Sequence, residues 1–367
     1  MKITRLACTG FRNLDHLDLS LQEEAIVFRG GNGQGKTNLL EALYVCATGR
    51  SFRHATPHDL LRFGESRAHL EATVMRQEVH HDVEVEITPR HKGVEVDGRH
   101  IRHAVKLLEL VNVVAFFPDD LKVAKGGPEE RRRLLDRAIA NYRPDFVDAS
   151  IHYTKVLKSR NVLLRDRGRL DRTLLETYDD QLVRYGHILH ACRVEGLEVL
   201  APLAVERFAA IMPAAGHLHL ELVTGVSQRA GEAFADAFRR GLVEGVPRDI
   251  ARGMTSIGPH RADLSLAIDG RDARLYASQG QQRALVLALK LAEVQALTAR
   301  LNGPPILLLD DISSELDAHH SRLLFAAVAE VGSQLWISTT GAAELPLVAS
   351  AQIFEVTAGR ITRCAKT

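Results

Sequence analysis

Two short segments near opposite ends of the chain contain residue types that bind nucleotide phosphates. The first reads Gly-Gly-Asn-Gly-Gln-Gly-Lys-Thr over residues 30–37 and fits the pattern G-x-x-x-x-G-K-[ST]. The backbone N–H groups of such a loop converge on phosphate oxygens, and its lysine neutralises their charge. We therefore predict that this segment and the residue after it bind phosphates. The candidate residues are Gly30, Gly31, Asn32, Gly33, Gln34, Gly35, Lys36, Thr37 and Asn38.

The second segment is an apolar run over residues 306–309 that ends in Asp310 and Asp311. A carboxylate at the end of a buried strand commonly shares a Mg²⁺ ion with the hydroxyl of a phosphate loop, and a neighbouring carboxylate can activate water. We expect Thr37 and Asp310 to bind Mg²⁺. The catalytic candidates are Lys36, Asp310 and Asp311. Acidic residues also end many strands for structural reasons, so this pair is specific only together with other motifs.

The elements predicted around the phosphate loop are those that such a loop requires. Apolar and alternating residues predict short strands over residues 3–28, and apolar residues at helical spacing after Thr37 predict a helix that ends at Gly49. Alternation over residues 66–101, with a turn at Asp97-Gly98, predicts an antiparallel meander. The phosphate loop is thus expected between a strand and a helix.

The middle of the chain has a different character. Helical spacing prevails from Pro128 to about residue 210, a strand-like segment follows at 217–223, and residues 229–251 again look helical. An α/β pattern resumes at Gly258 and continues to the end. We predict an α/β fold with two lobes. Its parts are residues 1–115 with the phosphate loop and meander, residues 116–250 as an inserted and mainly helical lobe, and residues 251–367, which complete the α/β lobe.

Composition limits the class of protein. The chain has 367 residues, of which 46% are hydrophobic and 25% charged, as in a globular protein of two or three domains. No window approaches the roughly 18 apolar residues of a membrane span, and Met1–Arg5 does not resemble an export segment, so we expect a cytoplasmic protein. The four cysteines form no C-x-x-C pair and indicate neither a zinc site nor a disulfide framework. A net charge of +1 requires any nucleic-acid surface to concentrate its positive charge on one face.

A third motif precedes the acidic pair. Residues 278–281 read Ser-Gln-Gly-Gln, and Ser278 is a good N-cap for the helix predicted after it. Alone this is a weak signal, but the order of motifs strengthens it: phosphate loop, residues 278–281, paired acids, residues 312–317, and a strand that ends in Ser338-Thr339-Thr340. This order resembles that of the ATP-binding-cassette ATPases, in which the corresponding segments are the signature and the D-loop.

The resemblance is closest to one family within that class. The segments that carry it are residues 30–43, 125–128, 131–136, 256–263, 278–283 and 307–317. Together they resemble the RecF family, bacterial recombination mediators among the SMC-like cassette ATPases, over nearly the whole chain. The resemblance implies a bilobed ATPase head that uses ATP and Mg²⁺, forms an ATP-dependent homodimer and hydrolyses ATP slowly. It further implies binding to duplex and gapped DNA, cooperation with RecR and RecO in loading RecA at single-stranded gaps, and roles in replication and the SOS response.

The resemblance also assigns expected roles to residues outside the phosphate loop. The signature, Ser278, Gln279, Gly280 and Gln281, is expected to contact the γ-phosphate of a nucleotide held by a second subunit. Arg12 and Asn13 are expected near the nucleotide, Ser314 and Asp317 in the D-loop, and Thr339 and Thr340 where transporters carry a switch histidine. Gln279 replaces the first signature glycine, and threonine replaces that histidine. Both departures favour slow, switch-like turnover.

Two basic clusters are candidates for DNA contact, since cationic side chains bind phosphate without sequence preference. They are Arg131, Arg132 and Arg133, and Lys155, Lys158 and Arg160. Two structural alternatives remain open. A charge run is commonly a solvated helix face, and Arg131 to Arg133 could equally hold the lobes together.

Three other protein classes fit this sequence less well. A transporter ATPase subunit would be shorter, with a complete L-S-G-G-Q signature and a switch histidine. A nuclease of the overcoming-lysogenization type would carry a metal-binding domain after the ATPase motifs, and the residues after Thr340 are too few for one. A structural SMC scaffold would need long heptad arms, which the middle segment is too short to form.

Overall fold

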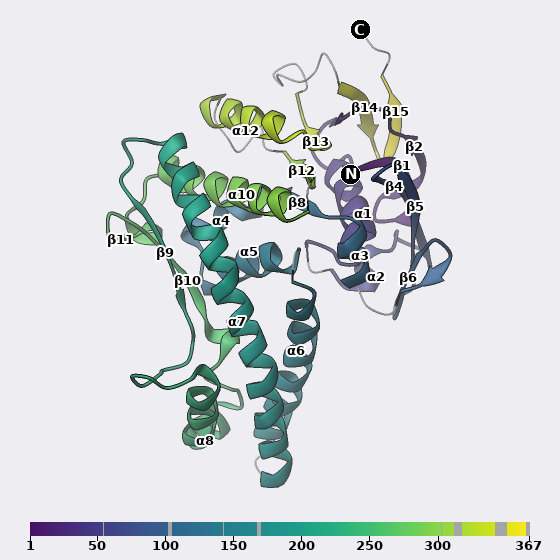
Figure 1. The fold of residues 1–367 in the computed structure, drawn as a ribbon. Helices are drawn as coiled ribbons and strands as arrows, with labels where there is room; N and C mark the ends of the chain where they lie inside the picture. The colour runs from purple at the N-terminus through teal and green to yellow at the C-terminus, as the bar shows by residue number, and fades with distance from the viewer. Residues whose placement is uncertain are drawn as a thin grey trace. The chain divides into compact units, whose positions relative to one another are not determined.

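The computed structural model describes residues 1–367 with the exception of 54, 102–104, 142, 167–169, 302, 312–317, 342–350 and 365–367. The chain divides into two compact units (Figure 1). The first unit consists of Met1–Leu121 and Lys290–Thr367, and the second of Lys122–Leu289.

The centre of the first unit is a mainly parallel sheet. Its strands are β3 (Ala25–Arg29), β8 (Val113–Phe116), β12 (Ile306–Asp310), β13 (Leu335–Thr339), β14 (Ala351–Thr357) and β15 (Arg360–Arg363), in the order β15-β14-β3-β13-β12-β8. Only β15 is antiparallel to its neighbour. All five residues of β12 and of β13 are buried, as expected for strands covered on both faces. The carboxyl ends of β3, β12 and β13 therefore lie side by side, with Asp310 opposite Ser338 and Ser338 opposite Phe28.

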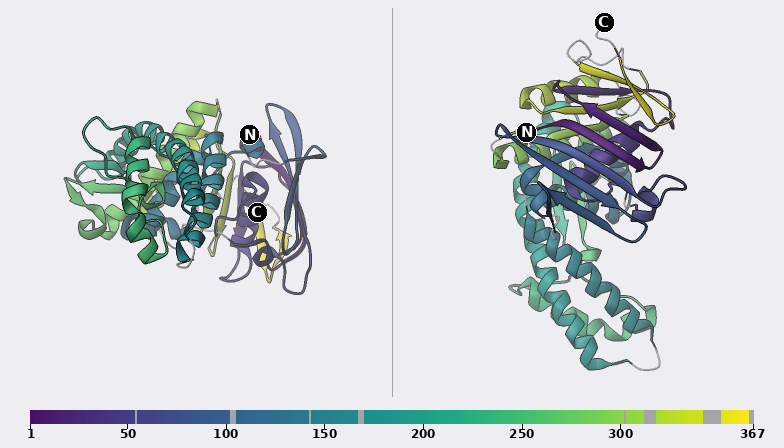
Figure 2. Two further views of the ribbon diagram at one scale, coloured as in Figure 1. Left: turned by 90° about the horizontal axis from the view of Figure 1, so that it is seen from below. Right: turned by 90° about the vertical axis from the view of Figure 1, so that its right-hand side faces the viewer.

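A second, antiparallel sheet forms the other layer of this unit. Its strands are β1 (Lys2–Phe11), β2 (Leu14–Ser20), β4 (Ala68–Arg76), β5 (Val79–Ile87), β6 (Lys92–Val96) and β7 (Arg99–His100), in the order β2-β1-β4-β5-β6-β7 (Figure 2, right). Its apolar face packs on helix α1 (Lys36–Thr48), which also contacts β12 and β13. The helix that follows the phosphate loop is thus held between two sheets. The predicted meander and its Asp97-Gly98 turn are confirmed.

Among the described residues of the first unit, the other helices are short, apart from α10 (Gln279–Leu301) and α12 (Ala318–Val331). They are α2 (Pro57–Leu60), α3 (Val105–Leu110), the 3₁₀ turn η1 (Pro118–Leu121) and α12, together with the C-terminal part of α10. The boundary between the units runs through α10, at Leu289 and Lys290.

The second unit is mainly helical. Its helices are α4 (Lys122–Lys125), α5 (Pro128–Ala140), α6 (Pro144–Arg165), α7 (Arg172–Ile211), α8 (Phe234–Arg252), η2 (Pro259–Arg261), α9 (Ala273–Tyr276) and the start of α10. A small antiparallel sheet, β11-β10-β9, contains β9 (Leu218–Val223), β10 (Asp263–Ile268) and β11 (Arg271–Asp272). Because β9 pairs with β10, this unit extends past residue 250, where the sequence predicted the end of the insertion.

The α/β class predicted from the sequence is confirmed, with both sheets and helices abundant. Among the described residues, none of the helices combines the length and the apolarity that crossing a membrane requires.

Candidate nucleotide-binding site

The phosphate loop connects the buried strand β3 to α1, and close contacts or positive φ angles require glycine at Gly30, Gly33 and Gly35. Gly33 and Gly35 have φ angles of 77° and 114°, in the region that favours glycine. A Cβ atom on Gly35 would lie 2.7 Å from Asn13 Oδ1, and one on Gly30 would lie 2.3 Å from the carbonyl oxygen of Val356. The loop therefore keeps its shape only if both positions lack a side chain.

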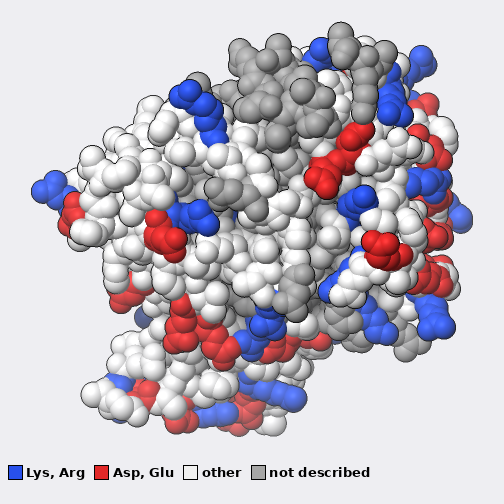
Figure 3. All heavy atoms as spheres, turned by 45° about the horizontal axis from the view of Figure 1, so that its top comes forward, with Lys and Arg blue, Asp and Glu red and all other residues white. Residues whose placement is uncertain are grey.

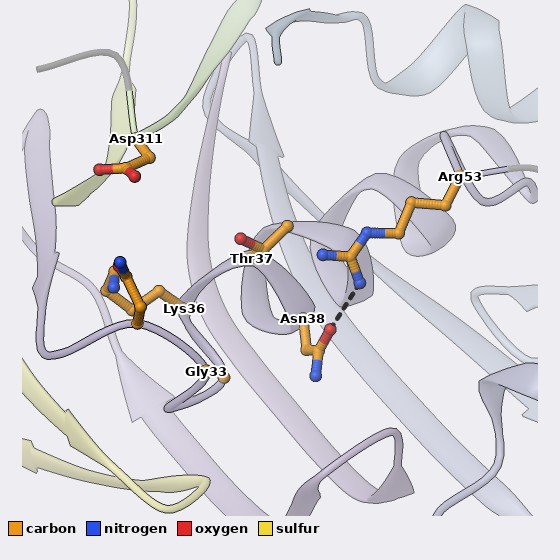
Figure 4. Close-up of a pocket in the computed structure, with 8 residues that line it drawn as sticks. Gly33, Lys36, Thr37, Asn38, Arg53 and Asp311 are labelled. Atoms are coloured by element: carbon orange, nitrogen blue, oxygen red, sulfur yellow. Dashed lines mark hydrogen bonds between the residues drawn. The ribbon is translucent and has the colours of Figure 1, made fainter. Parts of the chain in front are cut away.

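A cavity of about 280 Å³ opens over this loop (Figure 4). The residues that line it are Asn32, Gly33, Gly35, Lys36, Thr37, Asn38, Arg53 and Asp311. Backbone amides, two cationic side chains and a hydroxyl are the groups that bind phosphate oxygens. The lining thus has the chemistry that the motif predicts.

Lys36 and Thr37 occupy the first turn of α1. The Lys36 ammonium is almost completely buried and donates to the carbonyl oxygens of Gly30 (2.7 Å) and Gly31 (2.9 Å). The Thr37 hydroxyl donates to Asp310 Oδ1 at 2.9 Å, across 273 residues of sequence. The two distant halves predicted from the sequence therefore meet.

Asp310 is buried at the end of β12, where Ser338 Oγ also donates to its Oδ1, at 2.6 Å. Burial raises the pKa of this carboxyl group, while the hydrogen bonds from Ser338 and Thr37 act in the opposite direction. A desolvated carboxylate beside a threonine hydroxyl is a set of hard oxygen donors, and a divalent cation would offset the cost of its burial. These residues fit Mg²⁺.

Asp311 lies where the chain turns away from the sheet. Its φ is 47°, its backbone N–H donates to Ser338 O (3.1 Å) and Ser338 Oγ (2.9 Å), and it lines the cavity. Ser338, which the sequence analysis did not assign to the site, thus holds both acidic residues. Ser338 reaches this site because it lies opposite Asp310 in the parallel pair β12–β13. The register of two parallel strands cannot be predicted from one sequence, so Ser338 could not be assigned.

Asn13 and Arg12 differ in how they contact the loop. Asn13 Nδ2 donates to the carbonyl oxygen of Gln34 at 3.2 Å, and its Oδ1 accepts a hydrogen bond from Asn38 at 2.8 Å. Arg12 instead forms two 2.9 Å hydrogen bonds to Glu41 in α1 and does not line the cavity. Asn13 therefore contacts the phosphate loop directly, whereas Arg12 lies behind it.

Gln34 points away from the cavity, toward the turn between β14 and β15. Its Oε1 accepts from Ala358 N (2.7 Å) and its carbonyl oxygen accepts from Gly359 N (2.8 Å). The Gln34 side chain therefore connects the phosphate loop to this turn and does not line the cavity.

Arg53 is a cavity residue that the sequence reasoning missed. Its Nη1 donates to Asn38 Oδ1 at 2.8 Å (dashed in Figure 4) and lies 3.4 Å from Glu41, a completely buried carboxylate. Its guanidinium also lies over the Phe52 ring, 5.7 Å from the centroid. The available signal was Glu41 itself, because a charged residue on the buried face of a helix needs a cationic partner.

In the second unit, the signature caps its own helix. Ser278 Oγ accepts from Gln281 N at 3.2 Å, and Gln281 Oε1 accepts from Ser278 N at 2.8 Å, a reciprocal capping box. Ser278 and Gln279 are exposed, and a Cβ on Gly280 would meet nothing of this chain closer than 3.6 Å. Ser278 is therefore the N-cap that the sequence predicted.

The other switch candidates are only partly described. Ser314 and Asp317 lie outside the described residues. Thr339 is buried, its carbonyl oxygen accepts from Gly30 N at 3.2 Å and its hydroxyl exchanges hydrogen bonds with Gly341. Thr340 follows it and is exposed.

The six basic candidates for DNA contact fall into two groups. Arg131 binds Asp263 through two 2.8 Å hydrogen bonds, and Arg132 donates to the carbonyl oxygen of Ala262. Arg160 is completely buried and contacts Asp179, Asp249 and Thr255. These three arginines thus have partners inside the second unit.

Exposed side chains at the remaining three positions, Arg133, Lys155 and Lys158, are available to a phosphate backbone. Arg133 also pairs with Glu129 at the surface. On the face drawn in Figure 3, basic and acidic side chains are interspersed over the described residues, and no patch of one sign dominates.

Comparison with known proteins identifies the family. The model of the RecF/RecN/SMC N terminal domain matches residues 2–360. The DNA replication and repair protein RecF of Myxococcus xanthus is 40% identical over 345 residues, which cover 93% of this chain and 91% of the relative. RecF of Anaeromyxobacter sp. is also 40% identical, over 344 residues that cover 93% and 92%.

Solved structures agree with this family. A structure described as the recombination mediator protein RecF-ATP in the RecFOR pathway superposes with a TM-score of 0.88 at 28% identity, over 99% of this chain and 97% of the other. An Smc head domain from Pyrococcus furiosus shares the fold at a TM-score of 0.54 and 17% identity, over 99% and 96%. Given the match along almost its whole length, the chain belongs to the RecF family of SMC-like ATPases.

Proposed function

We propose that this protein is an ATP-binding mediator of DNA repair and recombination that acts as an ATP-controlled clamp on DNA. The observation that carries the proposal is the hydrogen bond between Thr37 and Asp310, which joins the two halves of the phosphate site. The names of the relatives, DNA replication and repair protein RecF, and the ATP-bound solved structure support the same function.

In this proposal the phosphate loop and Lys36 bind the phosphates of ATP, and Thr37 and Asp310 bind Mg²⁺. When bound there, Mg²⁺ would supply charge stabilisation to the phosphates. Asp311, which lines the same cavity, orients the attacking water. Lys36 exchanges its contacts with the Gly30 and Gly31 carbonyl oxygens for phosphate oxygens.

The signature acts in trans. Ser278 and Gly280 of one copy contact the nucleotide bound to a second copy, so ATP joins two protomers head to tail. The exposed start of α10 supports this role, because the N-terminus of a helix favours the binding of an anion. Slow hydrolysis then times the release of the dimer.

The clamp binds duplex and gapped DNA, and Arg133, Lys155 and Lys158 are the proposed contacts to the phosphate backbone. With RecR and RecO it promotes RecA loading at single-stranded gaps in the cytoplasm, in replication and in the SOS response. The solved relative's description places that protein in the RecFOR pathway, which supports these partners.

Light scattering tests the clamp. The protein is measured with and without Mg-ATP, each with and without a gapped duplex. We expect a dimer that forms only with ATP and retains the duplex. A monomer unchanged by saturating ATP contradicts the trans-acting signature, and cleavage of the duplex points to a nuclease instead.

A further inference from the structure

A buried ionic cluster lies at the points where the chain leaves the first unit. Lys290 is 2% exposed, and its ammonium lies 3.5 Å from Asp120 Oδ2 and 3.4 Å from Glu293 Oε2. Both carboxylates are buried as well. Burying three charged groups costs more free energy than apolar residues would, so such a cluster indicates a role beyond stability.

The position of this cluster along the chain is informative. The chain leaves the first unit after Leu121, next to Asp120, and returns to it at Lys290. Lys290 lies in α10, the helix whose first turn carries the signature. The ion pair between Lys290 and Asp120 therefore joins the signature helix to the segment that ends at Leu121, where the chain leaves the first unit.

From Asp120 a continuous series of contacts leads to the phosphate cavity. Asp120 Oδ2 accepts a hydrogen bond from Phe117 N at 3.0 Å. The Phe117 ring stacks on Phe52, with centroids 3.7 Å apart, and the guanidinium of Arg53 lies over Phe52. Arg53 lines the cavity and donates to Asn38. Every member of this series belongs to the first unit.

We propose that Lys290 is a positioning residue that couples the signature helix to the phosphate cavity through Asp120, Phe117, Phe52 and Arg53. In one direction, a displacement of α10 displaces the turn at Asp120 and, through the aromatic rings, Arg53. In the other direction, a bound phosphate that attracts Arg53 displaces α10 through the same contacts. The effect on ATP turnover rests on the proposed function, whereas the mechanical link does not. The test therefore measures the coupling directly.

The first experiment needs no ATP. Hydrogen exchange is compared in wild type, Lys290→Met, the conservative Lys290→Arg and, as a control on the same helix, Arg300→Met, which changes an exposed residue. We expect Lys290→Met to raise exchange at Arg50–Arg53 by about threefold or more, Lys290→Arg to restore it, and Arg300→Met to leave it unchanged. Unchanged exchange at Arg50–Arg53 in a folded Lys290→Met protein overturns the proposal.

Phe52→Leu keeps the test decisive if Lys290→Met fails to fold, because it interrupts the series without touching a buried charge. We expect this variant to raise exchange at Arg50–Arg53, because that segment no longer responds to the position of α10. If Phe52→Leu leaves the exchange of this segment at the wild-type level, the aromatic link is absent and the proposal fails.

The second experiment measures ATP turnover and the affinity for methylanthraniloyl-ATP. We expect Lys290→Met and Arg53→Gln each to lower kcat by about tenfold, and the double variant to be no slower than the slower single one. For Lys290→Met, affinity should stay within about twofold of wild type. Multiplicative effects on kcat mean that the residues act independently and overturn the coupling. If the wild-type protein neither dimerises nor hydrolyses ATP, the proposed function is contradicted. The exchange experiment still tests the coupling between Lys290 and Arg53 in that case.

Discussion

At the scale of single residues, Asp310 links the two halves of the phosphate site. One oxygen of its buried carboxylate accepts from hydroxyl groups on two other elements, Thr37 in α1 and Ser338 in β13. Burial nevertheless raises its pKa above the usual range, so desolvation outweighs those two hydrogen bonds. A carboxylate desolvated in this way lowers folding stability, and a divalent cation would offset that cost.

Asp310→Asn should therefore stabilise the nucleotide-free protein and impair its chemistry. A raised pKa means that the folded state binds the proton more tightly than the unfolded state. The associated stability is full at low pH and is lost as pH rises through the pKa of the folded protein. At pH 7 we expect a higher Tm than wild type without ligand, but turnover of Mg-ATP at least about 100-fold slower. Thermal unfolding from pH 4 to 8 checks the first point, and a lower Tm at pH 7 would contradict it.

His260 should give the second unit the opposite pH dependence. Burial lowers its pKa to about 4, and the neutral ring accepts from Tyr153 OH at Nδ1 and donates to Thr255 O at Nε2. Protonation favours the unfolded state, so stability falls as pH drops from about 6.5 toward 4, by at most about 3 kcal/mol. His260→Gln should flatten this decline in acid-unfolding measurements, whereas the exposed His58→Gln should not. An unchanged slope in His260→Gln contradicts this role.

The same scale shows what sequence reasoning reaches. The phosphate loop and Asp310 were identifiable because their chemistry requires fixed residue types at fixed spacing. Arg53 was missed: the buried Glu41 indicated a cationic partner, but that Arg53 is one of its partners depends on contacts formed in three dimensions. For Arg160 a signal did exist: it falls on the buried stripe Tyr153, Val156, Arg160 and Leu164 of α6, which marks it as a core residue rather than a surface cation.

At the scale of elements, the hairpin β14–β15 supports the phosphate loop from outside. Ala358 N and Gly359 N donate to Gln34, and the Val356 carbonyl oxygen lies against Gly30. The strand β14 pairs in parallel with β3 although more than 300 residues separate them. Such pairing cannot be read from one sequence, because the register of parallel strands is set by packing and not by local spacing.

Gly359→Ala should disturb this support. Gly359 has a φ of 79°, and a Cβ there would lie 2.1 Å from the carbonyl oxygen of Asn13. Gly98→Ala is a matched control, since Gly98 has a φ of 71° and open space around it. Both variants lose about 1 kcal/mol to backbone strain. Only Gly359→Ala should also lower ATP affinity, by about tenfold or more in a binding titration. Equal affinity in the two variants would mean that the hairpin does not shape the loop.

At the scale of the whole molecule, the order of motifs along the chain was predictable, and the two-unit division follows from it. Residues 122–289 are inserted between the phosphate loop and the strand that ends in Asp310. The end of the insertion could not be predicted, because the β9–β10 pairing that draws residues 263–268 into the second unit is itself a long-range contact. The first unit contains the phosphate cavity, and the second contains the capped signature, which we propose contacts the nucleotide of a second copy.

A mixing experiment tests whether these surfaces meet across two protomers. Lys36→Ala removes the buried cation of the loop and should abolish ATP binding by the monomer. Ser278→Arg places a large cation where the signature must approach phosphate; it costs about 1 kcal/mol of helix capping but leaves the cavity intact. Alone, neither variant should dimerise with ATP or hydrolyse it.

In a head-to-tail heterodimer of the two variants, one site combines both lesions, while the other combines the intact loop of the Ser278→Arg protomer with the intact signature of the Lys36→Ala protomer. Mixing the inactive proteins should therefore restore hydrolysis, up to about half the wild-type rate per dimer if the sites act independently. A signature that acts only within its own chain gives no recovery at any mixing ratio. Because each variant is inactive alone, recovery in the mixture requires that a single ATP be bound by residues of two protomers.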